Sequence, residues 1–323
     1  MPWDERIGRR LKLRDLHVLR TVAQLGSMGK AATQLAVSQP AISQAITDLE
    51  RVLGVRLLDR SRHGVEPTPY GRAFLKWSAV IFDNLKQGVE EIDYLADPTA
   101  GEVRFGTIEI MIAGLVPHII SQLSRQYPRL TFTVMQAATR AMMHRDLRER
   151  TVDFIFGRMV LPSTEGDLDV EFLYEDPLVA VVGASSKWLR RRKIDAAELI
   201  DEPWCLPPFD WYAEAAGSLI PEAFRASGLA VPRHTVKSNS GHLFLYLVAT
   251  GRFISALPAS MVHLNGKRLG VKSLPFKFPI RPDPICIATL KGRSISPAAR
   301  LFIECARELA KPFAKGAAGR PPA

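Results

Sequence analysis

The segment from Ser27 to Leu53, SMGKAATQLAVSQPAISQAITDLERVL, constrains the fold of this chain more than any other. It predicts two short helices joined by a tight turn, because Ser27 and Ser38 suit helix N-termini and Pro40 is tolerated in a first helical turn. Apolar side chains recur at helical spacing in the second helix and predict one buried face. These side chains are Ile42, Ile46, Leu49 and Leu53.

The opposite face of this second helix is polar and carries small hydrogen-bonding groups with one cation: Pro40, Ser43, Gln44, Thr47 and Arg51. A helix that buries one face and presents such groups on the other suits the major groove of DNA. An ordinary amphipathic helix pair is the alternative that the same pattern allows. The flanking segments favour the DNA-reading interpretation.

A helix over Leu11–Leu25 is expected to support the pair. After Gly54, which suits a helix C-terminus, apolar residues around Leu57 and Val65 predict two short strands. Between them lies a cationic tip of Arg60, Ser61, Arg62, His63 and Gly64. Arginines at such a tip can enter the minor groove beside the site that the helix reads.

A long helix is predicted over Tyr70–Ala96, a segment that contains no proline. At 1.5 Å per residue it spans roughly 40 Å, which suits pairing with another copy of the chain. The alternative is a helix packed along its own domain. Pairing would supply two reading helices for a near-palindromic DNA site.

From Gly101 the pattern changes to alternating strands and helices, which predicts mostly parallel sheets with ligands at the carboxyl ends of strands. Strands are expected at 103–108, 131–136, 152–157, 170–174, 178–183, 204–206, 234–237, 253–257 and 285–289. Helices are expected at 112–127, 139–150, 211–227, 241–250 and 297–310. Residues 312–323 are expected to be disordered.

The net charge of +10 favours a polyanionic partner without locating it, because the region after residue 98 is basic as well. Cys205, Cys286 and Cys305 lack metal-site spacing, so buried reduced thiols are expected, with a redox-sensing pair as the alternative. No signal peptide or membrane span is predicted, which indicates a cytoplasmic protein. No catalytic motif is found, so neither an enzyme nor a cofactor or metal is expected.

The segment GSMGKAATQLAVSQPAISQAITDLERVLGVRLLDR, followed by PTPYG and the long helix, resembles the N-terminus of a LysR-type transcriptional regulator. The resemblance extends over the whole chain, through LVPHII near Leu115, LRERTVDFIFG around Leu147 and LVATGRFISALPAS from Leu247. It implies an α winged helix-turn-helix over residues 1–69 and a linker helix over 70–98. An α/β, two-lobed, periplasmic-binding-protein-like effector domain over 99–311 would follow, usually in a homotetramer of two dimers.

The same resemblance implies contacts to double-stranded promoter DNA. Base contacts would come from Gln39, Pro40, Ser43, Gln44 and the adjacent Thr47. Many relatives have arginine where Gln44 stands, and glutamine favours adenine over the guanine that arginine prefers. Lys30 and Ser38 would hold phosphates, and Arg60 and Arg62 would belong to the wing.

An effector is implied between the two lobes, near Glu109, Ile110, Thr139, Arg140, Pro207, Phe209, Ser238 and Asn239. Glu109 would suit a hydroxyl-rich or cationic effector, or else be an exposed loop carboxylate. Ile110 departs from the Ser or Thr of many relatives. Thr139 and Arg140 would suit an anionic effector, although Thr139 alone could be a helix cap. Phe209 and Trp211 would stack on a ring or simply pack.

The expected function is therefore DNA binding controlled by a small molecule, whose closure of the lobes alters DNA bending and contact with RNA polymerase. The alternatives are an enzyme and a small-molecule-binding protein, each with an accessory helix-turn-helix.

Overall fold

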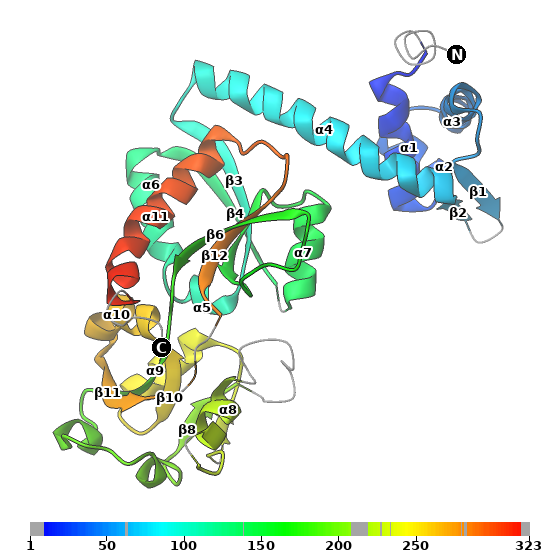
Figure 1. Ribbon diagram of the computed structural model, residues 1–323. Coiled ribbons are helices and arrows are strands. Elements are labelled where there is room, and N and C mark those ends of the chain that lie inside the picture. Colours follow the sequence, from blue (N-terminus) through cyan, green and yellow to red (C-terminus); the bar gives the residue numbers. More distant parts are fainter. Residues whose placement is uncertain are drawn as a thin grey trace. The chain divides into compact units, whose positions relative to one another are not determined.

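The computed structural model of the 323-residue chain describes residues 10–61, 64–137, 139–207, 219–226, 228–232, 234–278, 280 and 283–317 (Figure 1). The chain divides into two compact units, Met1–Gly88 and Val89–Ala323. Arg62, His63, Phe209 and Trp211, which the sequence singled out, lie outside the described residues.

The first unit contains three helices, α1 (Leu13–Leu25), α2 (Met28–Gln34) and α3 (Gln39–Leu53), followed by the start of α4 (Pro69–Ala96). The predicted caps are confirmed, because Ser27 Oγ accepts a hydrogen bond from Lys30 N and Ser38 Oγ accepts one from Ala41 N. The predicted buried face of α3 is also confirmed, with Ile42, Ile46 and Leu49 at most 1% exposed. These side chains share one core with Leu16, Leu19 and Val22 of α1.

Two antiparallel strands, β1 (Leu58–Ser61) and β2 (Gly64–Pro67), form the predicted wing. The expectation that Arg60, Ser61 and Gly64 lie in its tip is wrong. Arg60 and Ser61 belong to β1 and Gly64 to β2, because Arg60 pairs with Val65 and Ser61 with Gly64.

The second unit contains two five-stranded sheets, each of which defines a lobe. The first lobe has the strand order β4-β3-β5-β12-β6 and the second has β11-β7-β10-β8-β9. The strands of the first are β3 (Ala100–Thr107), β4 (Arg129–Gln136), β5 (Phe154–Arg158), β6 (Leu168–Tyr174) and β12 (Ile285–Leu290). Those of the second are β7 (Leu178–Gly183), β8 (Trp204–Leu206), β9 (His234–Lys237), β10 (Ile254–Pro258) and β11 (Val271–Lys277).

The helices of the second unit connect or cover these strands (Figure 1). They are α5 (Glu109–Ile112), α6 (Val116–Gln126), α7 (Arg140–Arg148), α8 (Leu219–Ala226), α9 (Gly241–Ala249), α10 (Ala259–Leu269) and α11 (Pro297–Ala317), with short 3₁₀ turns η2 (Lys187–Arg190) and η3 (Ala196–Leu199). The sequence did not predict α10 or β11.

The sheets are mostly parallel, as expected, and each has one strand that runs against the other four. In the first lobe this strand is β12, which is antiparallel to both β5 and β6. In the second it is β7, which is antiparallel to both β10 and β11. Both reversed strands follow a segment that crosses from one lobe to the other, and this crossing accounts for their reversed direction.

Disorder was expected from residue 312 onward. For residues 312–317 this expectation is wrong, because α11 continues to Ala317 with Pro312 inside it. Phe313 supplies the reason. Its ring lies 5.2 Å from that of Tyr174, and it packs with Ala314 against the core of the first lobe. Apolar packing therefore extends the helix past a proline that suggested an end.

Gly71, in the first turn of α4, provides a test of the packing between this helix and the wing. A Cβ at this position would lie 2.0 Å from the backbone oxygen of Leu57, which accepts a hydrogen bond from Thr68 N. We expect Gly71→Ala to destabilise the first unit by about 1–3 kcal/mol through overpacking. Hydrogen exchange of α3 peptides should measure this as faster exchange. Gly29→Ala in α2 is the control, because the nearest atom to its Cβ position lies 3.7 Å away; equal protection in both variants would contradict the expectation.

Candidate nucleic-acid interface and ligand site

The outward face of α3 carries the side chains that the sequence predicted for base contact. Gln39, Pro40, Gln44 and Thr47 are exposed and Ser43 is half-buried. The buried face of the same helix holds Ile42 and Ile46, so the polar face is directed away from the core. The arrangement leaves small donors and acceptors open to a ligand along the helix.

The wing meets this face, because Arg60 Nη1 donates a hydrogen bond to Ser43 Oγ at 3.3 Å. Asp48, the acidic residue beside the face, accepts hydrogen bonds from Gln44 Nε2 at 2.9 Å and from Arg51 Nη1 at 2.7 Å. The two partners thus engage the carboxylate that would repel a polyanion. Lys30 is exposed on α2, and Ser38 caps α3, which leaves both at the edge of this face.

Glu50 positions the wing and was missed by the sequence analysis. Its Oε1 atom accepts hydrogen bonds from the backbone N–H groups of Leu57 and Leu58, at 2.7 and 3.2 Å. This carboxylate joins the last turn of α3 to the start of β1. The signal available in the sequence was a charged residue directly after Leu49, which lies on the buried face of α3. The hydrogen-bond partners of this residue could not be inferred from spacing.

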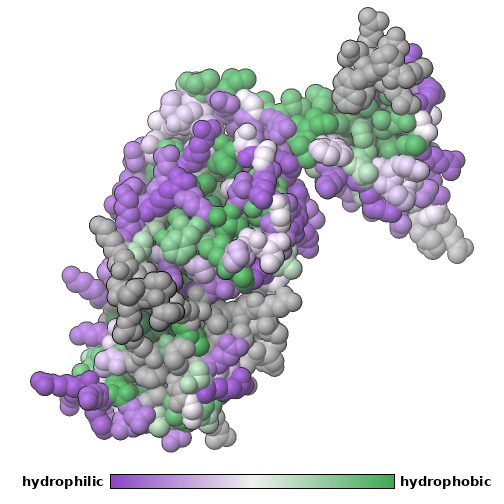
Figure 2. Space-filling model, in the orientation of Figure 1, coloured by the Kyte–Doolittle hydropathy of each residue, from purple (hydrophilic) through white to green (hydrophobic). Residues whose placement is uncertain are grey.

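After its first turns, α4 carries apolar side chains that are mostly exposed. Trp77, Ile81, Leu85, Val89, Ile92 and Leu95 are between 36% and 78% exposed. Figure 2 shows hydrophobic residues over the middle of this helix. Phe74 is different, because it packs against the core of the first unit. The start of α4 therefore packs along its own domain, as one of the two sequence interpretations had it, and the exposed stripe follows it.

The candidate effector residues of the first lobe follow the carboxyl ends of adjacent strands. Thr107 of β3 lies opposite Gln136 of β4, which brings the starts of α5 and α7 to one edge of the sheet. Thr139 caps α7, since its Oγ1 accepts a hydrogen bond from Met142 N. Arg140 Nη2 donates to Asp283 Oδ2 at 3.0 Å, and Ile110 packs against the core of the lobe.

The candidate effector residues of the second lobe lie at the corresponding edge of its sheet. Pro207 follows β8, and Ser238 and Asn239 follow the neighbouring strand β9. Ser238 N donates to the carbonyl oxygen of Leu206, and Ser238 Oγ accepts from Ser240 N at 3.1 Å. The hydroxyl of Ser238 thus shapes the turn into α9.

Glu109 connects these two edges. Its Oε2 atom accepts a hydrogen bond from Gly241 N at 2.8 Å, and its Oε1 atom accepts longer ones from Ser240 Oγ and His242 N. The side chain is 16% exposed. The interpretation of Glu109 as an exposed loop carboxylate is therefore wrong.

Arg158, at the end of β5, joins the two segments that cross between the lobes and was also missed by the sequence analysis. Its guanidinium donates to the backbone oxygens of Asp176, at 2.8 Å, and Asp283, at 2.6 Å. Burial lowers the pKa of Arg158, with the charge of Asp176 acting in the opposite direction. The Asp176 carboxylate accepts from Ser260 N and Ser260 Oγ at the start of α10, and burial raises its pKa. A charged residue that ends the buried run DFIFGR was the signal.

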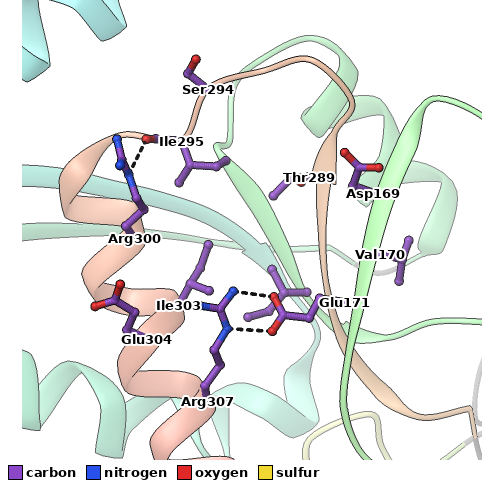
Figure 3. Close-up of a pocket in the computed structure, with 11 residues that line it drawn as sticks. Asp169, Val170, Glu171, Thr289, Ser294, Ile295, Arg300, Ile303, Glu304 and Arg307 are labelled. Atoms are coloured by element: carbon purple, nitrogen blue, oxygen red, sulfur yellow. Dashed lines mark hydrogen bonds and ion pairs between the residues drawn. The ribbon is translucent and has the colours of Figure 1, made fainter.

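A hollow of about 670 Å³ lies in the first lobe between β6, β12 and α11 (Figure 3). The sequence did not predict it. Its apolar wall includes Ile287, Ile295 and Ile303. Arg307 forms two hydrogen bonds with the carboxylate of Glu171 across it, at 2.7 and 2.8 Å, so these two charges are directed at one another.

The three cysteines are free and buried, as expected. Burial raises the pKa of Cys205 to about 11 and that of Cys286 to about 12, and it also raises the pKa of Cys305. Within the described ranges, no group of three or more His, Cys, Asp or Glu residues could hold a metal ion. No described helix is long and apolar enough to cross a membrane.

Two family models match the chain, "LysR substrate binding domain" over residues 96–311 and "Bacterial regulatory helix-turn-helix protein, lysR family" over residues 13–72. The HTH-type transcriptional regulator GbpR of Azospirillum brasilense is 29% identical over 299 residues, which cover 92% of this chain and 86% of that protein. Full-length OxyR from Pseudomonas aeruginosa has a similar structure, with a TM-score of 0.62, 25% identity and coverage of 97% and 99% of the two chains. The structure of full-length CbnR with its target DNA has a TM-score of 0.57 at 22% identity, covering 93% of this chain and all of that one, and shows the shared fold.

The buried cysteines give a prediction about thiol reactivity. Because the thiolate is the reactive form, a raised pKa leaves little of it at pH 8. We expect a thiol-specific chromogenic reagent to label none of the three cysteines rapidly in the native protein and all three in guanidinium. One fast-reacting thiol in the native protein would contradict the burial and favour the redox-sensing interpretation.

Proposed function

The chain belongs to the LysR family of bacterial transcriptional regulators, and from this we propose that it binds specific sites on double-stranded promoter DNA under the control of a small-molecule effector. The observation that supports this most is the outward polar face of α3, with Arg60 of the wing in contact with Ser43. Since the target is DNA, we place the protein in the cytoplasm.

In the proposed complex α3 enters the major groove, and Gln39, Pro40, Ser43, Gln44 and Thr47 face the base edges. Lys30 and Ser38 hold phosphates beside the groove, and Arg60 and Arg62 act from the wing. Gln44 selects adenine, because its amide can pair with the N6 and N7 atoms of that base. To do so it exchanges its hydrogen bond with Asp48 for one with the base.

The proposed assembly is a homodimer that pairs through α4, with two dimers in a homotetramer. The exposed stripe from Trp77 to Leu95 supports it, because Ile81, Leu85, Ile92 and Leu95 follow the alternating three- and four-residue spacing of a coiled-coil seam when Gly88 is included. Two chains then present two copies of α3 to a near-palindromic site.

The proposed effector binds between the lobes and contacts Glu109, Ile110, Thr139 and Arg140 from the first lobe and Pro207, Ser238 and Asn239 from the second. Phe209, which lies outside the described residues, stays a proposed contact from sequence alone. Binding of the effector changes the relative placement of the paired DNA-reading helices, and so alters DNA bending and contact with RNA polymerase. In this proposal the effector is bound and released without chemical change.

Substitutions in α3 and in the wing should have different effects on DNA binding. Ser43→Ala and Gln44→Ala should each remove about 1–3 kcal/mol of discrimination between the preferred site and unrelated DNA, because they delete base contacts. Arg60→Ala should weaken binding to all sequences and reduce the salt dependence by about one phosphate contact. Mobility shifts over a range of salt concentrations on both DNAs would measure these effects.

Gln24→Ala is the matched control for Gln44→Ala, since Gln24 is an exposed glutamine on α1. Equal losses on specific and unrelated DNA for Ser43→Ala and Gln44→Ala would contradict base readout by α3.

A charge on the α4 stripe should separate the subunits. Leu85→Glu buries a carboxylate in the proposed seam and removes an apolar contact, so we expect the dimer dissociation constant to rise at least tenfold, which corresponds to about 1.4 kcal/mol. Sedimentation over a range of concentrations would measure it. Lys86→Glu introduces the same side chain off the stripe and should leave association unchanged; dissociation in both variants, or in neither, would contradict this seam.

A further inference from the structure

Glu109 makes its principal contacts with the other lobe. It is the first residue of α5, directly after β3 of the first lobe, and its carboxylate accepts the N–H groups of Gly241 and His242, which begin α9 of the second lobe. Ser240 Oγ adds a contact of 3.4 Å and His242 Nδ1 lies 3.4 Å from the same carboxylate oxygen. One side chain therefore receives four groups from a segment more than 130 residues away in sequence.

The N-terminus of α9 stabilises an anion, but the first turn of this helix contains no acidic side chain. Unpaired N–H groups and the helix dipole favour negative charge there. The first turn of α9 has no acidic residue, and Ser240 Oγ caps Leu243 N. Glu109 thus provides, from the other lobe, the carboxylate to which the first two N–H groups of α9 donate.

Gly241 admits this carboxylate. A Cβ at position 241 would lie 2.9 Å from Glu109 Oε2 and 2.8 Å from Met261 Cε. Gly241 does not have a left-handed backbone conformation, so its backbone does not require glycine. The absence of a side chain at this position therefore serves the close approach of the carboxylate.

The lobes also touch beside this contact without using Glu109. Asn265 Nδ2 of α10 donates to the backbone oxygen of Ala113 at 3.0 Å, and Ala113 is buried in a cluster with Phe244 and Met261 of the second lobe. The loss of the Glu109 carboxylate therefore leaves packing between the lobes intact, and its consequences can be measured in a folded protein.

We infer that Glu109 is a built-in carboxylate ligand that occupies the start of α9, joins the lobes in the absence of an effector and excludes carboxylate effectors from this place. The inference rests on the proposed function, because it concerns the class of effector that the inter-lobe site accepts. An effector bound at the start of α9 is then neutral or cationic, since a carboxylate would have to displace the one that the chain supplies.

Chemical rescue tests this role in the full-length protein. Glu109→Ala removes the carboxylate and leaves the N–H groups of α9, so we expect its thermal midpoint to fall by about 2–4 °C. Formate, acetate or propionate, titrated against chloride at equal ionic strength, should restore the midpoint in a saturable manner. The wild-type midpoint should not respond.

Two further variants separate binding from packing. Gly241→Ala retains Glu109 but puts a methyl group 2.9 Å from its Oε2 atom, so its midpoint should fall without rescue by any of the three anions. Glu149→Ala removes an exposed carboxylate at the C-terminal end of α7, where no helix N-terminus is vacated, and should show no carboxylate response.

Loss of stability in Glu109→Ala without rescue would overturn the inference and assign the side chain a packing role. An unchanged midpoint, or an equal carboxylate response in the wild type, would overturn it as well. The readout contains no DNA, so failure here is distinguishable from failure of the proposed promoter binding.

Discussion

The burial of one face of α3 is the constraint on which the DNA-binding unit depends. Ile42, Ile46 and Leu49 pack against α1 and α2, and this packing alone determines which side chains point outward. The Glu50 carboxylate then attaches the wing to the last turn of the same helix. A change in the core would therefore displace the polar face and the wing together, because Leu58 of β1 belongs to the same core and Val65 of β2 packs against it.

The caps and buried faces of the first unit could be predicted from sequence because they are local. Ser27 and Ser38 lie next to the helices that they cap, and the stripe on α3 repeats within fifteen residues. The predicted strand boundaries of the wing were wrong by about two residues. Strand pairing, which composition does not reveal, decides that Arg60 belongs to β1. The order of strands and helices in the second unit was also largely predictable from alternating patterns.

The features that were missed depend on contacts between distant segments. In β11, Pro275 conceals a strand that needs β7 as its partner, and in α10 a glycine and an asparagine weaken the helical pattern. The end of α11 depends on Phe313 meeting Tyr174. For Glu109 the sequence indicated only its place at a strand end, since its partners begin a helix in the other lobe. Whether the remaining candidate residues contact DNA or effector stays a prediction.

The position of Arg158 has a consequence for how the lobes can move. Two segments of the chain pass between the lobes, near Asp176 and Asp283. The backbone oxygens of both residues accept hydrogen bonds from the Arg158 guanidinium. Sliding one lobe past the other would stretch at least one of these bonds, whereas turning about the guanidinium keeps both. Arg158 therefore marks a pivot between the lobes. A rotation about it moves the far edges of the lobes through a wide arc and still keeps both of its hydrogen bonds.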